Sequence, residues 1–257
     1  MKRRKFPWQL FAMLLLIIAA FASAALALKP LIYNAEKTRE IKRENKQFYA
    51  NAEIVQGMVE EAEDAEEPEP FKQLYEAIQR YNGWLVDIRQ GNLTNRAATE
   101  VTPFLLVQYG LPDEVFGVIR IPAMDVEMPI YLGASEENMA NGAAVLSQTS
   151  IPIGGENTNA VIAGHRGWNG YPYFMDIEKL QKGDSVTITN LWGELTYKVT
   201  EIRIVYPDNI EAILIQEGKD MITLMTCHPP NSGGKYRYLV FCERTETTGG
   251  DAPVFIP

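Results

Sequence analysis

The stretch from Met221 to Arg244, MITLMTCHPPNSGGKYRYLVFCER, decides the fold. A run of apolar and β-branched residues ends at Cys227, a Pro/Asn/Gly-rich loop follows, and a second such run begins near Arg237. Runs of this kind, bounded by turn residues, are typical of strands joined by a hairpin loop. Five further runs precede it from about Val115, namely VFGVIRIP, VEMPIYL, AVIAG, SVTITN and LTYKVTEIRIVYP. The chain is therefore expected to be mainly β, with a closed or nearly closed barrel.

Short helices are expected beside these strands. The segment SEENMANGAAVL has Ser135 as a suitable N-cap, and YFMDIEKLQ forms a second helical insertion. Before the barrel, PFKQLYEAIQRYNGW carries apolar residues at helical spacing after Pro70, and Gly83 is expected to weaken or end that helix.

The amino-terminal end has the pattern of a membrane anchor. No charged residue occurs from Phe6 to Leu28, which is long enough for a spanning helix, and the basic MKRRK lies before it. The positive-inside rule then predicts a single pass through the plasma membrane, with the chain after Lys29 on the extracellular face. A cleaved signal peptide is the alternative, because Ala22-Ser23-Ala24 resembles a cleavage site.

Composition and charge exclude some classes of partner. The formal net charge is −9 and no Lys/Arg stripe is present, so nucleic acid is not an expected partner. The acidic block Glu60–Glu69 lacks the spaced ligands and turn glycine of a calcium loop, and a stalk is the expected structure. The expected divisions are 1–28, basic tip and transmembrane anchor; 29–90, helical and acidic stalk with amino-terminal helices; 91–114, lid-like or connecting segment; 115–246, catalytic barrel; and 247–257, tail.

Cys227 is the candidate nucleophile, since it ends a strand before a loop where a side chain can be exposed on a rigid support. A thiol with a pKa near 8.5 needs a base or a cation beside it to act at neutral pH. His165, in AVIAGHRGW, is the better of two histidines, because His228 directly follows Cys227 and should point to the opposite face. Arg237 lies across the hairpin loop and could donate to an acyl oxyanion.

Neither a disulfide nor a metal site is expected. Cys242 lies five positions beyond Arg237, about 17 Å along an extended strand and on its other face, so Cys242 should be a buried small hydrophobe. Two histidines and two misaligned cysteines do not supply a metal ligand set, and no cofactor is expected.

Three separated motifs resemble the sortases, and among them the class C, pilin-polymerising branch. TLMTC, ending at Cys227, resembles the family's cysteine signature, AGHRG around His165 its histidine motif, and RYLVFCER from Arg237 its last strand. The resemblance covers about Val115 to Arg244. It implies an eight-stranded sortase-type β-barrel preceded by the transmembrane helix and stalk.

The resemblance also implies a reaction. Cys227 would attack the Thr–Gly bond of an LPXTG-like sorting signal and form a thioacyl intermediate, His165 would protonate the departing amine, and Arg237 would hold the oxyanion. Class C enzymes pass the acyl group to a pilin lysine; the alternative is anchoring of surface proteins to a cell-wall precursor amine. LPXTG-bearing surface or pilin proteins are thus the implied partners, and the oligomeric state stays open.

Two features depart from the class C pattern. The region Asn92–Leu111 contains no Asp-Pro-aromatic tripeptide of the kind found in class C lids, and the chain stops at DAPVFIP without a second hydrophobic span. An open site without a lid is therefore expected. Two other classes are alternatives: a papain-like hydrolase, whose cysteine would precede its histidine near the start of a helix, and a tethered β-domain that only binds partners, with Cys227 buried.

Overall fold

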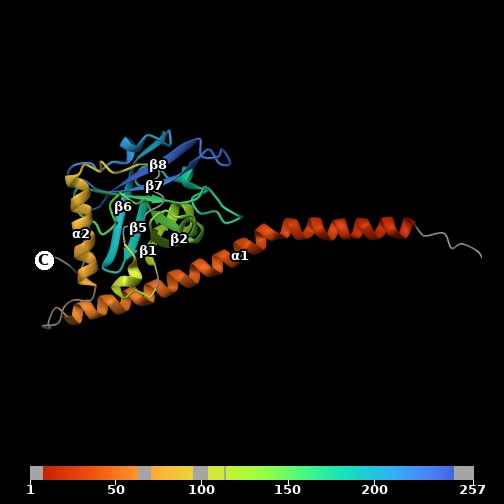
Figure 1. Cartoon of the computed structure of the whole chain (residues 1–257), viewed down its shortest axis with the longest axis horizontal. Coiled ribbons are helices and arrows are strands. Elements are labelled where there is room, and N and C mark those ends of the chain that lie inside the picture. Colours follow the sequence, from red (N-terminus) through yellow and green to blue (C-terminus); the bar gives the residue numbers. More distant parts are fainter. Residues whose placement is uncertain (1–7, 63–70, 95–103, 113, 246–257) are drawn as a thin grey trace, which may run out of the picture.

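The computed structural model describes residues 8–62, 71–94, 104–112 and 114–245. A β-barrel carries one helix along its side and a very long helix that runs under it and extends far beyond it (Figure 1). The basic tip, most of the acidic block, much of the 91–114 segment and the 247–257 tail lie outside the described residues.

Eight strands close the barrel in the order β1-β2-β3-β4-β7-β8-β6-β5, which confirms the predicted eight-stranded architecture. Most neighbours are antiparallel; β2 with β3 and β4 with β7 are parallel. The strands are β1 Val115–Ile121, β2 Val126–Leu132, β3 Ala143–Val145, β4 Thr158–Ala163, β5 Ser185–Asn190, β6 Gly193–Val205, β7 Asp220–His228 and β8 Tyr236–Arg244.

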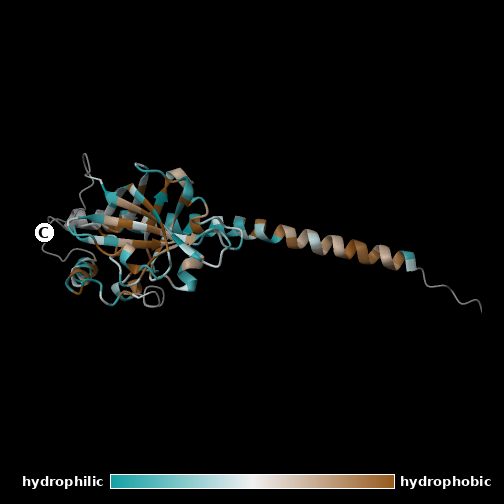
Figure 2. Cartoon of the chain, turned by 90° about the horizontal axis from the view of Figure 1, so that it is seen from above, coloured by the Kyte–Doolittle hydropathy of each residue, from teal (hydrophilic) through white to brown (hydrophobic). Residues whose placement is uncertain are grey.

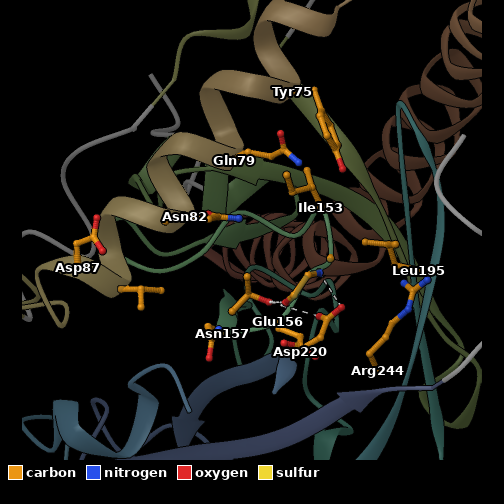
Figure 3. A pocket seen from close by; sticks show the side chains of 15 residues that line it. Tyr75, Gln79, Asn82, Asp87, Ile153, Glu156, Asn157, Leu195, Asp220 and Arg244 are labelled. Atoms are coloured by element: carbon orange, nitrogen blue, oxygen red, sulfur yellow. Dashed lines mark hydrogen bonds between the residues drawn. The ribbon is translucent and has the colours of Figure 1, made fainter. Parts of the chain in front are cut away.

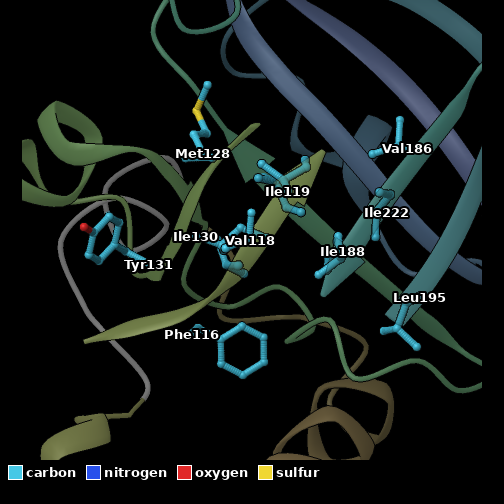
Figure 4. Packing of buried hydrophobic residues seen from close by; sticks show 14 of the residues in the cluster. Phe116, Val118, Ile119, Met128, Ile130, Tyr131, Val186, Ile188, Leu195 and Ile222 are labelled. Atoms are coloured by element: carbon cyan, nitrogen blue, oxygen red, sulfur yellow. The ribbon is translucent and has the colours of Figure 1, made fainter. Parts of the chain in front are cut away.

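The barrel interior is filled by aliphatic and aromatic side chains from every part of the sheet. Figure 4 shows Ile119, Ile130, Ile188 and Ile222 converging from four strands, and all four are fully buried. Since side chains alternate across a strand, every second residue faces this core, which is why short β-branched runs suit these positions.

A second apolar cluster lies on the other face of β7 and β8. Ile222 and Leu224 of β7 belong to the interior cluster, whereas Met221 and Met225 belong to the second cluster. Loop residues, among them Leu93, cover this outer face of the sheet. The alternation therefore assigns the odd-numbered residues of β7 to the outer face.

The long helix α1 (Trp8–Ala62) begins as an exposed apolar rod and continues as a helix packed on the barrel. Its first part is the one described helix long and apolar enough to cross a membrane, and it appears as the brown end of the helix in Figure 2. Pro30 lies inside α1, where the missing N–H favours a kink, and Figure 1 shows α1 bending as it leaves the barrel.

The later part of α1, which lies within the predicted stalk 29–90, packs against the barrel. Ile41, Phe48 and Val55 are at most 5% exposed and belong to the barrel's core cluster, and α1 contacts β1 and β2. Their spacing of seven residues keeps them on one face of a helix. Polar residues between them make this apolar face hard to recognise in the sequence.

The shorter helices agree with the predictions in part. The Ser135 side chain caps α4 (Glu136–Asn141) by accepting from the Asn138 N–H, as expected, but the residues that follow form β3. The second predicted insertion is only the 3₁₀ turn η3 (Ile177–Lys179). Gly83 does not end α2 (Lys72–Asp87), because buried Leu85 anchors the helix beyond it. The remaining 3₁₀ turns are η1 Leu106–Tyr109, η2 Pro122–Met124 and η4 Ile210–Ile213.

Candidate active site

The β7–β8 hairpin brings Cys227 and Arg237 directly opposite one another. The two residues are paired in the antiparallel register, and Arg237 Nη1 lies 3.7 Å from Cys227 Sγ. Arg237 Nη1 also donates to the Gly234 carbonyl at 2.9 Å, which holds the guanidinium over the sulfur. Because Cys227 is exposed, a substrate can reach this pair from solvent.

Gly234 in the hairpin loop is a requirement of the site that the motifs did not single out. Its φ is +79°, and a Cβ there would lie 2.9 Å from Arg237 Nη1 and 3.4 Å from Cys227 Sγ. A side chain at this position would therefore both strain the backbone and enter the space between the reactive groups. The glycine pair in NSGG was visible in the sequence as a turn signal only.

His165 follows β4, the strand that pairs with the Cys227 strand β7. The parallel β4–β7 register ends with Ala163 beside Met225, and the Gly164 N–H continues it by donating to the Met225 carbonyl at 3.0 Å. The Thr226 hydroxyl also donates to the Gly164 carbonyl at 2.7 Å. This pairing stops at Gly164 and Thr226, so His165 and Cys227 are the next residues along the two neighbouring segments.

Aromatic side chains surround the His165 ring. Trp168 stacks on it with ring centroids 4.9 Å apart and an interplanar angle of 16°, and Tyr173 meets it edge-on at 5.8 Å. Partial burial lowers the pKa of His165 below its ordinary 6.5, so the neutral imidazole is favoured at neutral pH. Sequence reasoning missed Trp168, although its position three residues after His165 was a possible signal.

His228 lies away from the reacting sulfur, as the alternation predicted. Its Nδ1 is 3.1 Å from Glu178 Oε1, and its ring is 5.5 Å from that of Tyr238, a member of the interior cluster. Arg166, next to His165, also contacts the Glu178 carboxylate at 2.8 Å. These contacts show that His228 and Arg166 share the Glu178 carboxylate, and that His228 lies on the interior side of the sheet beside Tyr238.

Cys242 is buried inside the barrel, as expected, and forms no disulfide with Cys227. Burial raises the pKa of its thiol strongly. The exposure of Cys227 also argues against the alternative of a binding domain in which this thiol is buried.

A cleft of about 150 Å³ extends from Arg237 along the outer face. Met225, Leu239 and Ile213 of η4 are among the residues that line it. The beginning of the 91–114 segment takes part, since Leu93 and Thr94 also line the cleft. The expectation of a site without a lid depends on residues 95–103, which lie outside the described residues.

A larger cleft, of about 550 Å³, lies at the opposite end of β7. Figure 3 shows Tyr75 and Gln79 of α2 on one side of it, with Asp220 and Arg244 on the other. Burial raises the pKa of Asp220, whose carboxylate accepts from the Gly155 N–H at 2.9 Å. Asp220 and Cys227 occupy opposite halves of β7, so this cleft lies well away from the thiol.

Among the described residues, no group of three or more His, Cys, Asp and Glu side chains could hold a metal ion. Within the described part of the chain, the group in contact with the Cys227 thiol is the Arg237 guanidinium. The guanidinium is permanently protonated and cannot ligate a metal.

Comparison with known proteins agrees with this arrangement. A family model described as the sortase domain matches residues 119–245, which include Cys227, His165 and Arg237. The solved structure of sortase C from Clostridium perfringens SM101 is 33% identical, with a TM-score of 0.57, and the match covers 76% of this chain and 99% of that one. The chain belongs to the sortase family.

Two further comparisons bear on the subclass. The structure titled sortase C1 of GBS pilus island 1 is 27% identical with a TM-score of 0.63, and the match covers 77% of this chain and all of that one. Sortase A of Bacillus anthracis is 35% identical over 127 residues, 49% of this chain and 58% of that protein. The chain thus spans somewhat over half the length of such curated relatives. Likeness to sortase C structures confirms the prediction that this sortase is most like class C.

Proposed function

We propose that this sortase is a cysteine transpeptidase that cleaves an LPXTG-like signal between Thr and Gly and transfers the acyl group to a pilin lysine. The observation that carries the proposal is the cross-strand pair, with Arg237 Nη1 at 3.7 Å from an exposed Cys227 Sγ. His165 follows β4, which pairs with the Cys227 strand β7. These are the three groups that acyl transfer through a thioester needs.

The first half-reaction uses all three side chains. The Cys227 thiolate attacks the threonine carbonyl carbon, a C–S bond forms, and the oxygen takes the negative charge. Arg237 donates to that oxygen, since its contacts with the described residues besides Cys227 are neutral carbonyls at 2.9 and 3.4 Å. The C–N bond then breaks, and the departing amine takes a proton from His165.

The second half-reaction reverses these steps with a new amine. The lysine amine attacks the thioester carbonyl and gives a proton to His165, an amide bond forms, and the C–S bond breaks. The low pKa of His165 suits the acceptance of this proton but leaves few imidazolium rings for the first half-reaction at neutral pH. Only a minor protonation state is then active at a given pH.

The cleft beside Arg237 supports a peptide substrate with an aliphatic residue. Its described walls are mainly apolar, with Leu93, Ile213 and Leu239 around a volume of about 150 Å³. A leucine side chain fits such a space, and its burial there favours binding by roughly 2 kcal/mol.

Transfer to a pilin lysine is favoured over transfer to a cell-wall amine by the structural comparison. The match to sortase C1 of GBS pilus island 1 covers 77% of this chain, more than the barrel alone, so segments outside the barrel match as well. Cell-wall anchoring is the second candidate, because curated relatives of this chain carry the name sortase A. In either role α1 would anchor the enzyme in the plasma membrane, with the barrel on the extracellular face.

A competition experiment tests the proposal. The full chain, in detergent or vesicles, is incubated with an LPXTG peptide and either a lysine-bearing pilin subunit or a glycine or lipid-linked amine. We expect a thioacyl adduct at Cys227 and an isopeptide product with the pilin. Adduct formation with product only from the glycine or lipid-linked amine would support wall anchoring, and an adduct on Cys227→Ala protein would overturn the thioester mechanism.

A further inference from the structure

The loop that follows His165 makes a tight hairpin that contacts the anchor helix. The Trp168 N–H donates to the Tyr171 carbonyl, and the Tyr171 N–H donates to the Trp168 carbonyl, both at 2.9 Å. The two residues between them have φ of +49° and +93°, as in a two-residue turn of type I′. We call residues 168–171 the NG hairpin, after its central Asn169-Gly170.

The tip of the NG hairpin lies against α1 at the membrane end of the barrel. A Cβ on Gly170 would be 2.8 Å from the Pro30 carbonyl oxygen, so only glycine permits this approach. Pro30 is two residues past Leu28, where the uncharged run ends, or about 3 Å along a helix. The hairpin tip is therefore within a few ångströms of the end of the span.

The position of the hairpin tip along α1 coincides with the interfacial layer of a bilayer. The uncharged run from Phe6 to Leu28 matches the roughly 30 Å hydrocarbon core, and the polar headgroup layer adds about 5–7 Å on each side. Lys29 comes directly after the run and favours the headgroup region. A group that touches Pro30 thus lies in or beside the headgroups.

The hairpin exposes the residue type that favours this layer. Trp168 is 48% exposed, and Met175, which packs against Gly167 beneath the hairpin, is 38% exposed. Tryptophan is enriched at membrane interfaces, because its apolar ring and its N–H suit a boundary that is wet on one side. One face of the Trp168 ring stacks on His165, which fixes its direction.

We propose that the NG hairpin rests on the same bilayer that holds α1, with Trp168 in the lipid headgroup layer. The occupant of this surface is lipid, because the contact with Pro30 sets the hairpin at the end of the span. Trp168 then contacts lipid on one side and the His165 ring on the other. The hairpin thus holds His165 close to the membrane surface. Docking on lipid goes beyond the proposed transpeptidation and does not depend on it.

Quenching of tryptophan emission by brominated lipids tests this placement in the full chain. The protein is reconstituted in phosphatidylcholine/phosphatidylglycerol vesicles, with or without lipids brominated near the headgroup, after Trp8→Phe removes the tryptophan within the anchor. Trp84, Trp168 and Trp192 remain. We expect bromolipid to quench part of the emission, and Trp168→Phe in this background to abolish that part.

Trp84→Phe in the same background is the matched control, since Trp84 is 40% exposed on α2. It should retain the quenchable emission. Emission that bromolipid leaves unchanged, or quenching that persists without Trp168, would overturn the proposal.

A second pair of variants keeps the test independent of the tryptophan itself. Gly170→Ala introduces a Cβ against Pro30 and should lift the hairpin, so the quenched fraction falls. Gly183→Ala carries a similar positive φ of +94° but has no atom within 4 Å of the new Cβ, so quenching should stay unchanged. Equal quenching in both variants would mean that the position of the hairpin does not affect the contact of Trp168 with lipid, and would contradict the proposal.

Discussion

Cys227 and Cys242 belong to the same β-hairpin, yet their surroundings are opposite. Cys227 is exposed beside a guanidinium, whereas Cys242 is fully buried among aliphatic side chains that raise the pKa of its thiol. Cys227 pairs with Arg237, and Cys242 pairs with Ile222 on the interior face. Two thiols on adjacent strands thus differ because a strand alternates its faces, and Cys242 faces the barrel interior.

The largest expected effect of this comparison is on catalysis. Cys227→Ala should reduce transpeptidation by about 10⁴-fold or more, since the nucleophile is lost. Cys242→Ala should retain the thioacyl adduct, because Cys242 faces the core. Mass spectrometry of the enzyme after incubation with an LPXTG peptide measures both variants. Loss of the adduct in Cys242→Ala protein that is still folded would break the comparison.

Substitution of Arg237 should have the next largest effect on the reaction rate. Arg237→Gln keeps a donor but removes the charge, and we expect acylation to slow by about 10²–10³-fold, the range for a lost oxyanion donor. Arg203→Gln is the matched control, since Arg203 is an exposed strand residue paired with Glu201 and lies over the Phe241 ring. Single-turnover acylation rates compare the two. A similar rate for both variants would mean that Arg237 is only structural.

The two cysteines should rank in the opposite order for stability. Substitution of Cys242 should lower the free energy of unfolding more than substitution of Cys227. Cys242→Ser introduces a hydroxyl into an apolar interior and should lower the free energy of unfolding by roughly 1–3 kcal/mol. Cys227→Ser at an exposed position should change it by less than about 0.5 kcal/mol. Urea denaturation of the full chain in detergent gives both values, and an equal loss in the two variants would show that Cys227 is also a packing residue.

The smallest expected effect concerns the His165 ring. Burial lowers its pKa, so Trp168→Ala, which uncovers one face of the ring, should raise that pKa toward 6.5. Because the unfolded chain binds the proton more readily, His165 makes stability fall as pH drops below about 6.5, and the variant should show a shallower fall. An NMR titration of the imidazole signal, assigned with His165→Ala, measures the shift; an unchanged or lower pKa would contradict burial by Trp168.

Local patterns predicted most of the site. The strand-ending position of Cys227, the hairpin loop before Arg237 and the opposite direction of His228 follow from turn residues and a two-residue period. Cross-strand pairing and contacts with Glu178 agree with them. The catalytic roles of Cys227, His165 and Arg237 stay predictions until the variants are measured.

Other features could not be predicted from local pattern. The buried face of the later part of α1 is sparse in apolar residues, and only the barrel beside it makes Ile41 and Phe48 core residues. Gly83 is expected to weaken or end α2, and the helix continues past it because burial of Leu85 outweighs the cost of about 1 kcal/mol for a glycine in a helix. The segment AAV of β3 has no strand signature of its own and forms a strand by pairing with β2 and β4.

The sequence by itself determined the strand-rich class, the apolar span and the choice of three candidate groups for the site, because these depend on residue type and on spacing along one element. Only the tertiary structure decided that Gly234 must lack a side chain, that Trp168 covers His165, and that the NG hairpin touches Pro30. Each of these depends on a distance between atoms in the folded chain, and a linear pattern carries no such distance.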